Sequence, residues 1–143
     1  MMRSRTSWIP KLRPEQEPKL VKDPHGKGRM LVPTPLLVAE EVRRVRKGRL
    51  LTSRDLRERI AARTGADVTC PMTTGIFLSI IAGAAEEQLA AGKRPVAPYW
   101  RVVGENGRLN PKWPPGPERQ AERLRREGHR VSRDRVHDSW SVQ

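Results

Sequence analysis

The sequence predicts a mainly helical domain of the winged helix-turn-helix class, with a short β-hairpin as its wing. Three observations support this fold class. Start and stop signals bracket three successive helical segments between residues 34 and 92. A short β-branched run and a glycine-flanked turn follow at residues 101–109, as in a hairpin. The chain is strongly basic, with 29 Lys and Arg against 16 Asp and Glu and a net charge of +13, which favours a polyanionic partner, nucleic acid first.

The first helix is expected to begin at Pro35. Thr34 before it is a good N-cap residue, and proline is favoured at the first position of a helix. Apolar residues follow at roughly helical spacing as far as Val45, and Gly48 ends the run. The pattern indicates a helix with one buried face.

Two further helices are expected after short connections. Thr52 and Asp55 form a pair resembling a capping box, which opens a second helix that ends at Gly65. The third helix runs from Pro71 to Gly92 and is unusually apolar and rich in small residues. Its long apolar stripe indicates a buried face.

A wing and a last helix complete the expected domain. Residues 101–103 and 108–109 are expected to pair as two short strands around a turn at residues 104–107. A proline-rich loop follows, and Pro117 opens a final helix that ends at Gly128. Three helices followed by a wing, on a basic domain, are typical of winged helix-turn-helix proteins.

Composition divides the chain into three parts. Residues 1–29 carry eight Lys and Arg, three Asp and Glu and four Pro, and we expect them to form a basic, disordered N-terminal arm. Residues 30–128 form the predicted domain, which is basic in its own right, with 18 Lys and Arg against 11 Asp and Glu. Residues 129–143 are expected to be a polar C-terminal tail.

Residue content also bounds the function classes. A single cysteine, Cys70, excludes an intramolecular disulfide and a cysteine-based zinc site, as is usual in a reducing cytoplasm. No apolar stretch approaches the roughly 20 residues that span a bilayer, and no apolar region follows the basic N-terminus as in a secretory signal. His25, His129 and His137 lie in or beside the predicted tails, so we expect no metal site and no cofactor. The expectation is a cytoplasmic monomer without membrane contact.

Three stretches match, in order, the motifs of one known family. Residues 98–103 read Pro-Tyr-Trp-Arg-Val-Val before a glycine-containing turn, where the family has Pro-Cys-His-Arg-Val-Val. Residues 48–56 look like the family's Gly-x-Val-x-Thr-Tyr-Gly-x-Ile, and residues 124–128 look like its Leu-Leu-x-x-Glu-Gly. Over about 85 residues, from 43 to 128, the chain therefore resembles the C-terminal, DNA-binding and active-site domain of alkylguanine-DNA alkyltransferases.

The resemblance implies a protein without the family's catalysis. In active members a Cys-His-Glu relay produces the thiolate that accepts the alkyl group. Here Tyr99 stands at the position of the cysteine and Trp100 at that of the histidine, and the carboxylate is retained as Glu127, for which we expect a structural role. A phenol, with an ordinary pKa of about 10 and no neighbouring base, is a poor acceptor at neutral pH. The sequence therefore predicts no catalytic residue.

Inactive alkyltransferase-like members of the family bind alkylated guanine and present it to nucleotide excision repair. The resemblance thus implies binding of double-stranded DNA, with or without an alkylated guanine. The expected base pocket consists of Pro98, Tyr99, Trp100, Arg101 and Val102, with Tyr99 the more exposed of the two aromatic residues. The expected DNA contacts are Thr52, Ser53, Arg54, Thr73, Thr74 and Arg101.

Two departures from the family pattern affect base flipping. Ser53 stands where active members have a tyrosine that presses on the phosphate of the flipped nucleotide. The segment Thr73–Ser79 contains no arginine to fill the space that a flipped base vacates.

Three alternatives remain open at this stage. The chain can be an architectural or regulatory nucleic-acid binder that has lost lesion recognition. The basic arm around Trp8 can bind an acidic protein, such as a repair partner. The chain can also be an enzyme that uses Cys70, which lies at a predicted helix N-terminus where thiolates are stabilised, although no histidine is near it in sequence.

Overall fold

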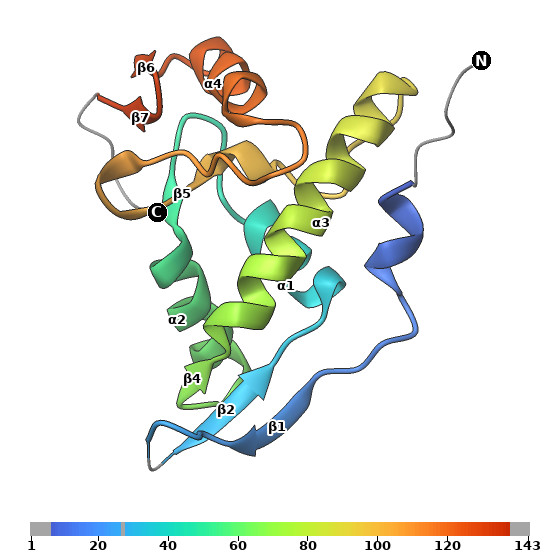
Figure 1. Ribbon diagram of the computed structural model, residues 1–143. Coiled ribbons are helices and arrows are strands. Elements are labelled where there is room, and N and C mark those ends of the chain that lie inside the picture. The colour runs from blue at the N-terminus through green and yellow to red at the C-terminus, as the bar shows by residue number, and fades with distance from the viewer. Residues whose placement is uncertain (1–6, 27, 138–143) are drawn as a thin grey trace.

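The computed structural model describes residues 7–26 and 28–137, and Figure 1 shows how the elements are arranged. Within these residues, α-helices, 3₁₀ turns and several short strands form a mixed α/β fold in which helix predominates. The α-helices are α1 (Pro35–Arg43), α2 (Ser53–Thr64), α3 (Pro71–Ala90) and α4 (Pro117–Arg126). Their starting points are those that the capping signals predict.

Local capping explains the helix boundaries. Thr34 Oγ1 accepts the Leu37 backbone N–H at 3.1 Å, and Thr52 Oγ1 accepts that of Asp55 at 3.0 Å. Each bond satisfies one of the N–H groups that the first turn of a helix leaves without a partner. Gly65 ends α2 with a φ of +75°, a left-handed conformation that glycine adopts without steric cost.

Short strands join segments that are distant in sequence. β1 (Lys19–Lys22) pairs antiparallel with β2 (Arg29–Val32), and β2 pairs in parallel with β4 (Val68–Thr69). β3 (Leu51–Thr52) pairs in parallel with β5 (Val102–Val103), and β6 (Val131–Ser132) pairs antiparallel with β7 (Arg135–Val136). The 3₁₀ turns are η1 (Ile9–Leu12), η2 (Tyr99–Arg101) and η3 (Glu105–Gly107).

The apolar core surrounds α3, which crosses the middle of the molecule with α1, η1 and η2 packed against it (Figure 1). Val38 of α1, Leu56 of α2, Ile81 of α3 and Leu124 of α4 are fully buried in one apolar cluster. Val102 of β5 joins the same cluster. The pairing of β3 with β5 therefore holds the 98–103 motif against the start of α2.

The prediction of a disordered arm does not hold for the part of residues 1–29 that the structure describes. Leu12 of η1 is buried, and the Trp8 indole packs directly on α3 at Gly83. The Trp8 backbone N–H donates to the Glu87 carboxylate. β1 is the edge strand of the sheet that it forms with β2 and β4 (Figure 1).

Edge pairing explains why the arm lacked a sequence signal. All four side chains of β1 are exposed, so the strand is held by backbone hydrogen bonds to β2 and shows no alternation of apolar and polar residues. Residues 1–6 and Lys27 lie outside the described residues.

The expected hairpin over residues 101–109 also needs correction. Val102 and Val103 pair in parallel with β3, and Arg108 forms an isolated bridge with Arg135. One hydrogen bond, from the Gly104 N–H to the Arg108 carbonyl at 2.7 Å, closes the turn between them. The antiparallel hairpin of this region is β6–β7, within the segment predicted to be a polar tail. Val131 and Val136 are buried there, and this burial explains why the hairpin is ordered.

Candidate nucleic-acid interface

The 98–102 motif lies in the interior of the domain. Tyr99 is fully buried and Trp100 is 8% exposed, so the expectation that Tyr99 is the more exposed aromatic residue is wrong. The Tyr99 ring packs edge-on against Trp100 and Trp113, with centroid distances of 5.4 and 5.7 Å. Pro98 is half-buried beside them. Of the five predicted pocket residues, Val102 lines an open cleft, which is described below.

A carboxylate and an arginine hold the buried Tyr99. Its hydroxyl donates to Glu86 Oε2 at 2.7 Å, and Arg123 donates to both oxygens of the same carboxylate, at 3.0 and 2.7 Å. Burial raises the pKa of Tyr99, and the hydrogen bond to Glu86 raises it further. Burial also tends to raise the pKa of Glu86, but the hydrogen bonds from Arg123 and Tyr99 outweigh it and hold that pKa below its ordinary value.

Trp100 and Arg101 form a second network of the same kind around Glu127. The Trp100 indole N–H donates to Glu127 Oε2 at 3.0 Å, and Arg101 Nη2 donates to the same oxygen at 2.8 Å. Arg101 Nη1 donates to the Val45 carbonyl at 2.8 Å. Burial tends to raise the pKa of Glu127, and hydrogen bonds from Arg101 and Trp100 more than offset it, so this pKa is lowered.

These two networks determine what the motif can do chemically. Tyr99 is a buried, neutral phenol whose O–H is engaged in a hydrogen bond to Glu86. The indole of Trp100 has an N–H donor and no lone pair that could act as a base. The geometry therefore assigns Tyr99, Trp100, Arg101 and Glu127 to holding η2 between α3 and α4.

Three of the six predicted DNA contacts also use their polar atoms inside the protein. Thr52 caps α2, as described above. The Thr74 hydroxyl is buried and donates to the Cys70 carbonyl at 2.7 Å. Arg101 is bound to Glu127 and Val45.

The other three predicted contacts are partly or fully accessible. Arg54 is exposed and lies 3.6 Å from Glu58, an ion pair that contributes little on a surface. Thr73 Oγ1 lies 3.0 Å from the Cys70 sulfur. Ser53, the first residue of α2, lines the cleft that also contains Val102.

That cleft, which we call the α2–α3 cleft, has a volume of about 320 Å³. It lies where the start of α2, the first two turns of α3, β5 and the loop of residues 104–113 meet. Apolar residues form part of its lining: Leu78, Val102, Val103, Leu109 and Trp113. Its polar lining includes Ser53 and Asn110, and both of its charged residues are arginines, Arg57 and Arg108.

Trp113 is an unusual part of this lining. It is almost completely buried, and its indole N–H has no acceptor among the described residues. A buried donor without a partner costs free energy, so this side chain is held in place by packing. Sequence reasoning placed Trp113 in a loop and missed Arg108 and Asn110, because their approach to α2 and α3 depends on the β3–β5 pairing.

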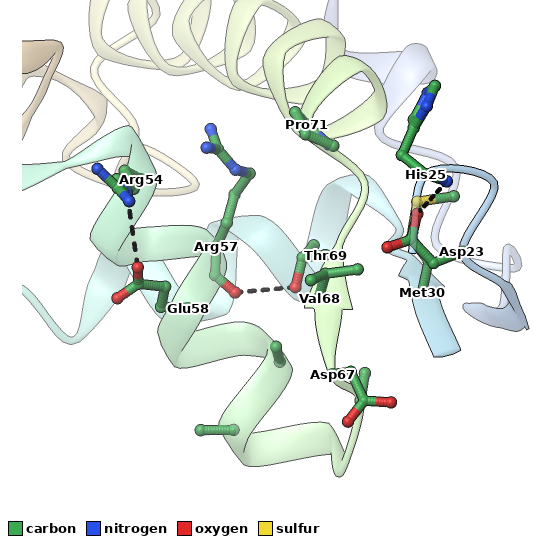
Figure 2. Close-up of a pocket in the computed structure, with 13 residues that line it drawn as sticks. Asp23, His25, Met30, Arg54, Arg57, Glu58, Asp67, Val68, Thr69 and Pro71 are labelled. Atoms are coloured by element: carbon green, nitrogen blue, oxygen red, sulfur yellow. Dashed lines mark hydrogen bonds and ion pairs between the residues drawn. The ribbon is translucent and has the colours of Figure 1, made fainter. Parts of the chain in front are cut away.

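A larger pocket of about 490 Å³ adjoins the cleft, and the two share Arg57 and Pro71 (Figure 2). Figure 2 shows the Thr69 hydroxyl donating to the Arg57 carbonyl, at 2.8 Å, which ties β4 to α2. Acidic and basic side chains are mixed around this pocket: Asp23, Glu58 and Asp67 with His25, Arg54 and Arg57. It therefore lacks the uniformly positive lining of the α2–α3 cleft.

Cys70 and the histidines were the remaining candidates for chemistry. Cys70 is buried, and the contact that its sulfur makes is with the Thr73 hydroxyl. Over the described ranges, no three His, Cys, Asp or Glu side chains are grouped closely enough to hold a metal ion. Among the helices of the same ranges, none is long and apolar enough to cross a membrane.

Comparison with known proteins leaves the family open. No protein-family model matches the chain, and a search of curated proteins finds no match to it.

Proposed function

We propose that this protein is a non-catalytic binder of duplex DNA, and that DNA lies across the α2–α3 cleft. The observation that carries this proposal is the lining of the cleft, where Arg57 and Arg108 are the charged residues and Trp113 and Leu109 are apolar. Arginines pair with phosphates, and an apolar cleft with a few polar groups accommodates a nucleotide-sized ligand. In this proposal α2 and α3 form the helix pair that faces DNA, and the turn of residues 104–107 stands in the place of the expected hairpin wing.

The size and electrostatics of the cleft support a nucleotide-sized ligand. Its volume of about 320 Å³ falls within the range of small-ligand sites. Ser53 begins α2 at the cleft, so the positive end of the helix dipole adds to the charge of the arginines. The net charge of +13 attracts DNA at longer range.

The absence of catalysis and the cellular site are parts of the same proposal. Tyr99 and Trp100, at the positions of the family's nucleophile and base, are bound inside the protein to Glu86 and Glu127. We infer from the single buried cysteine and the charge that the protein acts on DNA in the cytoplasm.

Two versions of the function differ in lesion recognition. The resemblance to alkyltransferase-like proteins favours a sensor of alkylated guanine, with the lesion held in the α2–α3 cleft. The burial of Tyr99 and Trp100 favours the second version, a nucleic-acid binder that no longer recognises lesions, because neither ring is available to stack on a base.

A salt series of affinities tests the proposal. It uses one duplex with and without a single alkylated guanine, and compares the wild-type protein with Arg57→Ala and Arg94→Ala. Arg94 is an exposed arginine beyond the far end of α3, so Arg94→Ala removes the same charge as Arg57→Ala at a position outside the cleft lining. We expect Arg57→Ala to reduce the log–log salt slope by about 0.9, the value of one phosphate contact, and Arg94→Ala to leave it unchanged.

Each outcome has a definite meaning. No binding of either duplex, or equal effects of the two variants, overturns the α2–α3 cleft as the DNA site. A preference of about tenfold for the alkylated duplex, equivalent to about 1.4 kcal/mol, supports the lesion sensor. Equal binding of both duplexes supports the version without lesion recognition.

A further inference from the structure

The start of α3 exposes two large apolar side chains. Met72 is 73% exposed and Ile76 is 53% exposed, the highest values among the large exposed apolar residues of the described chain. They are four residues apart and therefore lie on one face of the helix, one turn above the other. Gly75 is exposed beside them, and a Cβ placed on it would meet nothing within 4 Å. We call Met72 and Ile76 the α3 ridge.

The α3 ridge borders the α2–α3 cleft. Pro71, Thr74, Gly75 and Leu78, from the same two turns of α3, line the cleft. The ridge is adjacent to these residues on the helix surface, so it stands along the α3 edge of the cleft.

The charges of α3 and of the α2–α3 cleft indicate which class of partner fits against the ridge. Residues 71–85 of α3 include no charged side chain, so the ridge itself is neutral. The neighbouring cleft contributes Arg57 and Arg108 and no acidic residue. The acidic residues of α3, Glu86 and Glu87, lie at its other end and bind Tyr99, Arg123 and the N-terminal segment. An apolar ridge beside a positive, acid-free cleft is complementary to stacked bases flanked by phosphates.

We propose that Met72 and Ile76 form a wedge that inserts between base pairs of bound duplex DNA, kinks it and unstacks one base beside the α2–α3 cleft. This inference rests on the proposed DNA-binding function. Apolar side chains act as wedges of this kind in proteins that bend DNA. Met72 has a flexible thioether side chain, which can adapt to the opened base step.

The test uses a duplex that contains 2-aminopurine, whose fluorescence rises when the base is unstacked. The full-length protein is compared with Met72→Ala/Ile76→Ala and with the control Leu20→Ala. Leu20 is 43% exposed on β1, so the control removes apolar surface outside the cleft lining. All three side chains are exposed, so each variant is expected to fold, and circular dichroism checks this.

We expect the wild-type protein and Leu20→Ala to raise the fluorescence, and the double variant to lose most of that rise. The double variant should also bind about tenfold more weakly. Its log–log salt slope should match that of the wild-type protein, because no phosphate contact is removed.

The outcomes separate the wedge from the DNA-binding function itself. If the wild-type protein binds duplex without a rise in fluorescence, or the double variant keeps the rise, the wedge is wrong and DNA binding stands. If the wild-type protein binds no duplex, both proposals fail. If the protein is a dimer without DNA and the double variant is a monomer, the ridge is a protein interface and the wedge is wrong.

Discussion

Replacing Tyr99 by phenylalanine tests whether the motif is structural. The substitution removes one hydroxyl and keeps the ring, so the edge contacts with Trp100 and Trp113 survive. It deletes the 2.7 Å hydrogen bond to Glu86, whose carboxylate remains paired with Arg123.

The expected cost of Tyr99→Phe follows from that geometry. A hydrogen bond to a charged group contributes about 1.5–3 kcal/mol to stability. Because Glu86 keeps both hydrogen bonds from Arg123, we expect a loss near the lower limit, about 1.5 kcal/mol. Tyr99→Ala also removes the buried ring, and the loss should reach about 3–5 kcal/mol.

Urea denaturation measures both losses, and duplex binding is measured on the same samples well below the unfolding midpoint. The folded fraction of Tyr99→Phe should bind duplex with the wild-type affinity, since the side chain is fully buried. A variant with unchanged unfolding free energy but weakened DNA binding would refute this reasoning, because it would place the hydroxyl at the interface.

Two further predictions follow from the interior contacts. Glu86 and Glu127 have a folded-state pKa below the unfolded value. Their contribution to stability is therefore complete above an unfolded pKa of about 4.3 and is lost as the pH falls through the folded-state values. The urea midpoint should decline between pH 7 and pH 3, and an unchanged midpoint would contradict the two hydrogen-bond networks. Gly83→Ala should displace Trp8, because the new Cβ would lie 2.5 Å from the indole. A red-shifted tryptophan emission and faster proteolysis of the N-terminal segment would report this displacement. The control Gly75→Ala, on the same helix with no atom within 4 Å, should instead stabilise by up to about 1 kcal/mol.

Sequence reasoning succeeded where a feature depends on near neighbours. Thr34, Thr52 and Gly65 mark helix boundaries through bonds and backbone angles that involve residues at most four or five positions away. Such local chemistry is present in the order of the residues and needs no knowledge of the fold. The capping signal at Thr52 also places Ser53 at the first position of α2, and Ser53 lines the α2–α3 cleft.

The candidate site was predicted less well, because it depends on distant pairings. The parallel pairing of β3 with β5 joins residues about 50 positions apart and brings Arg108 and Trp113 to α2 and α3. The two valines of β5 carry no sequence pattern that specifies β3 as their partner strand. The edge strand β1 shows the same limit, since its exposed side chains are compatible with either an arm or a strand.

The sequence by itself determined the net charge of +13, the starts of the four helices, the single cysteine and the order Pro-Tyr-Trp-Arg-Val-Val at residues 98–103. These are properties of residue identity and of contacts within a few positions. Only the tertiary structure decided that both aromatic residues face Glu86 and Glu127, so that the motif supports the domain from inside. The physical reason is that a side chain with an apolar ring and a polar tip suits a surface or a core equally, until packing supplies the acceptor.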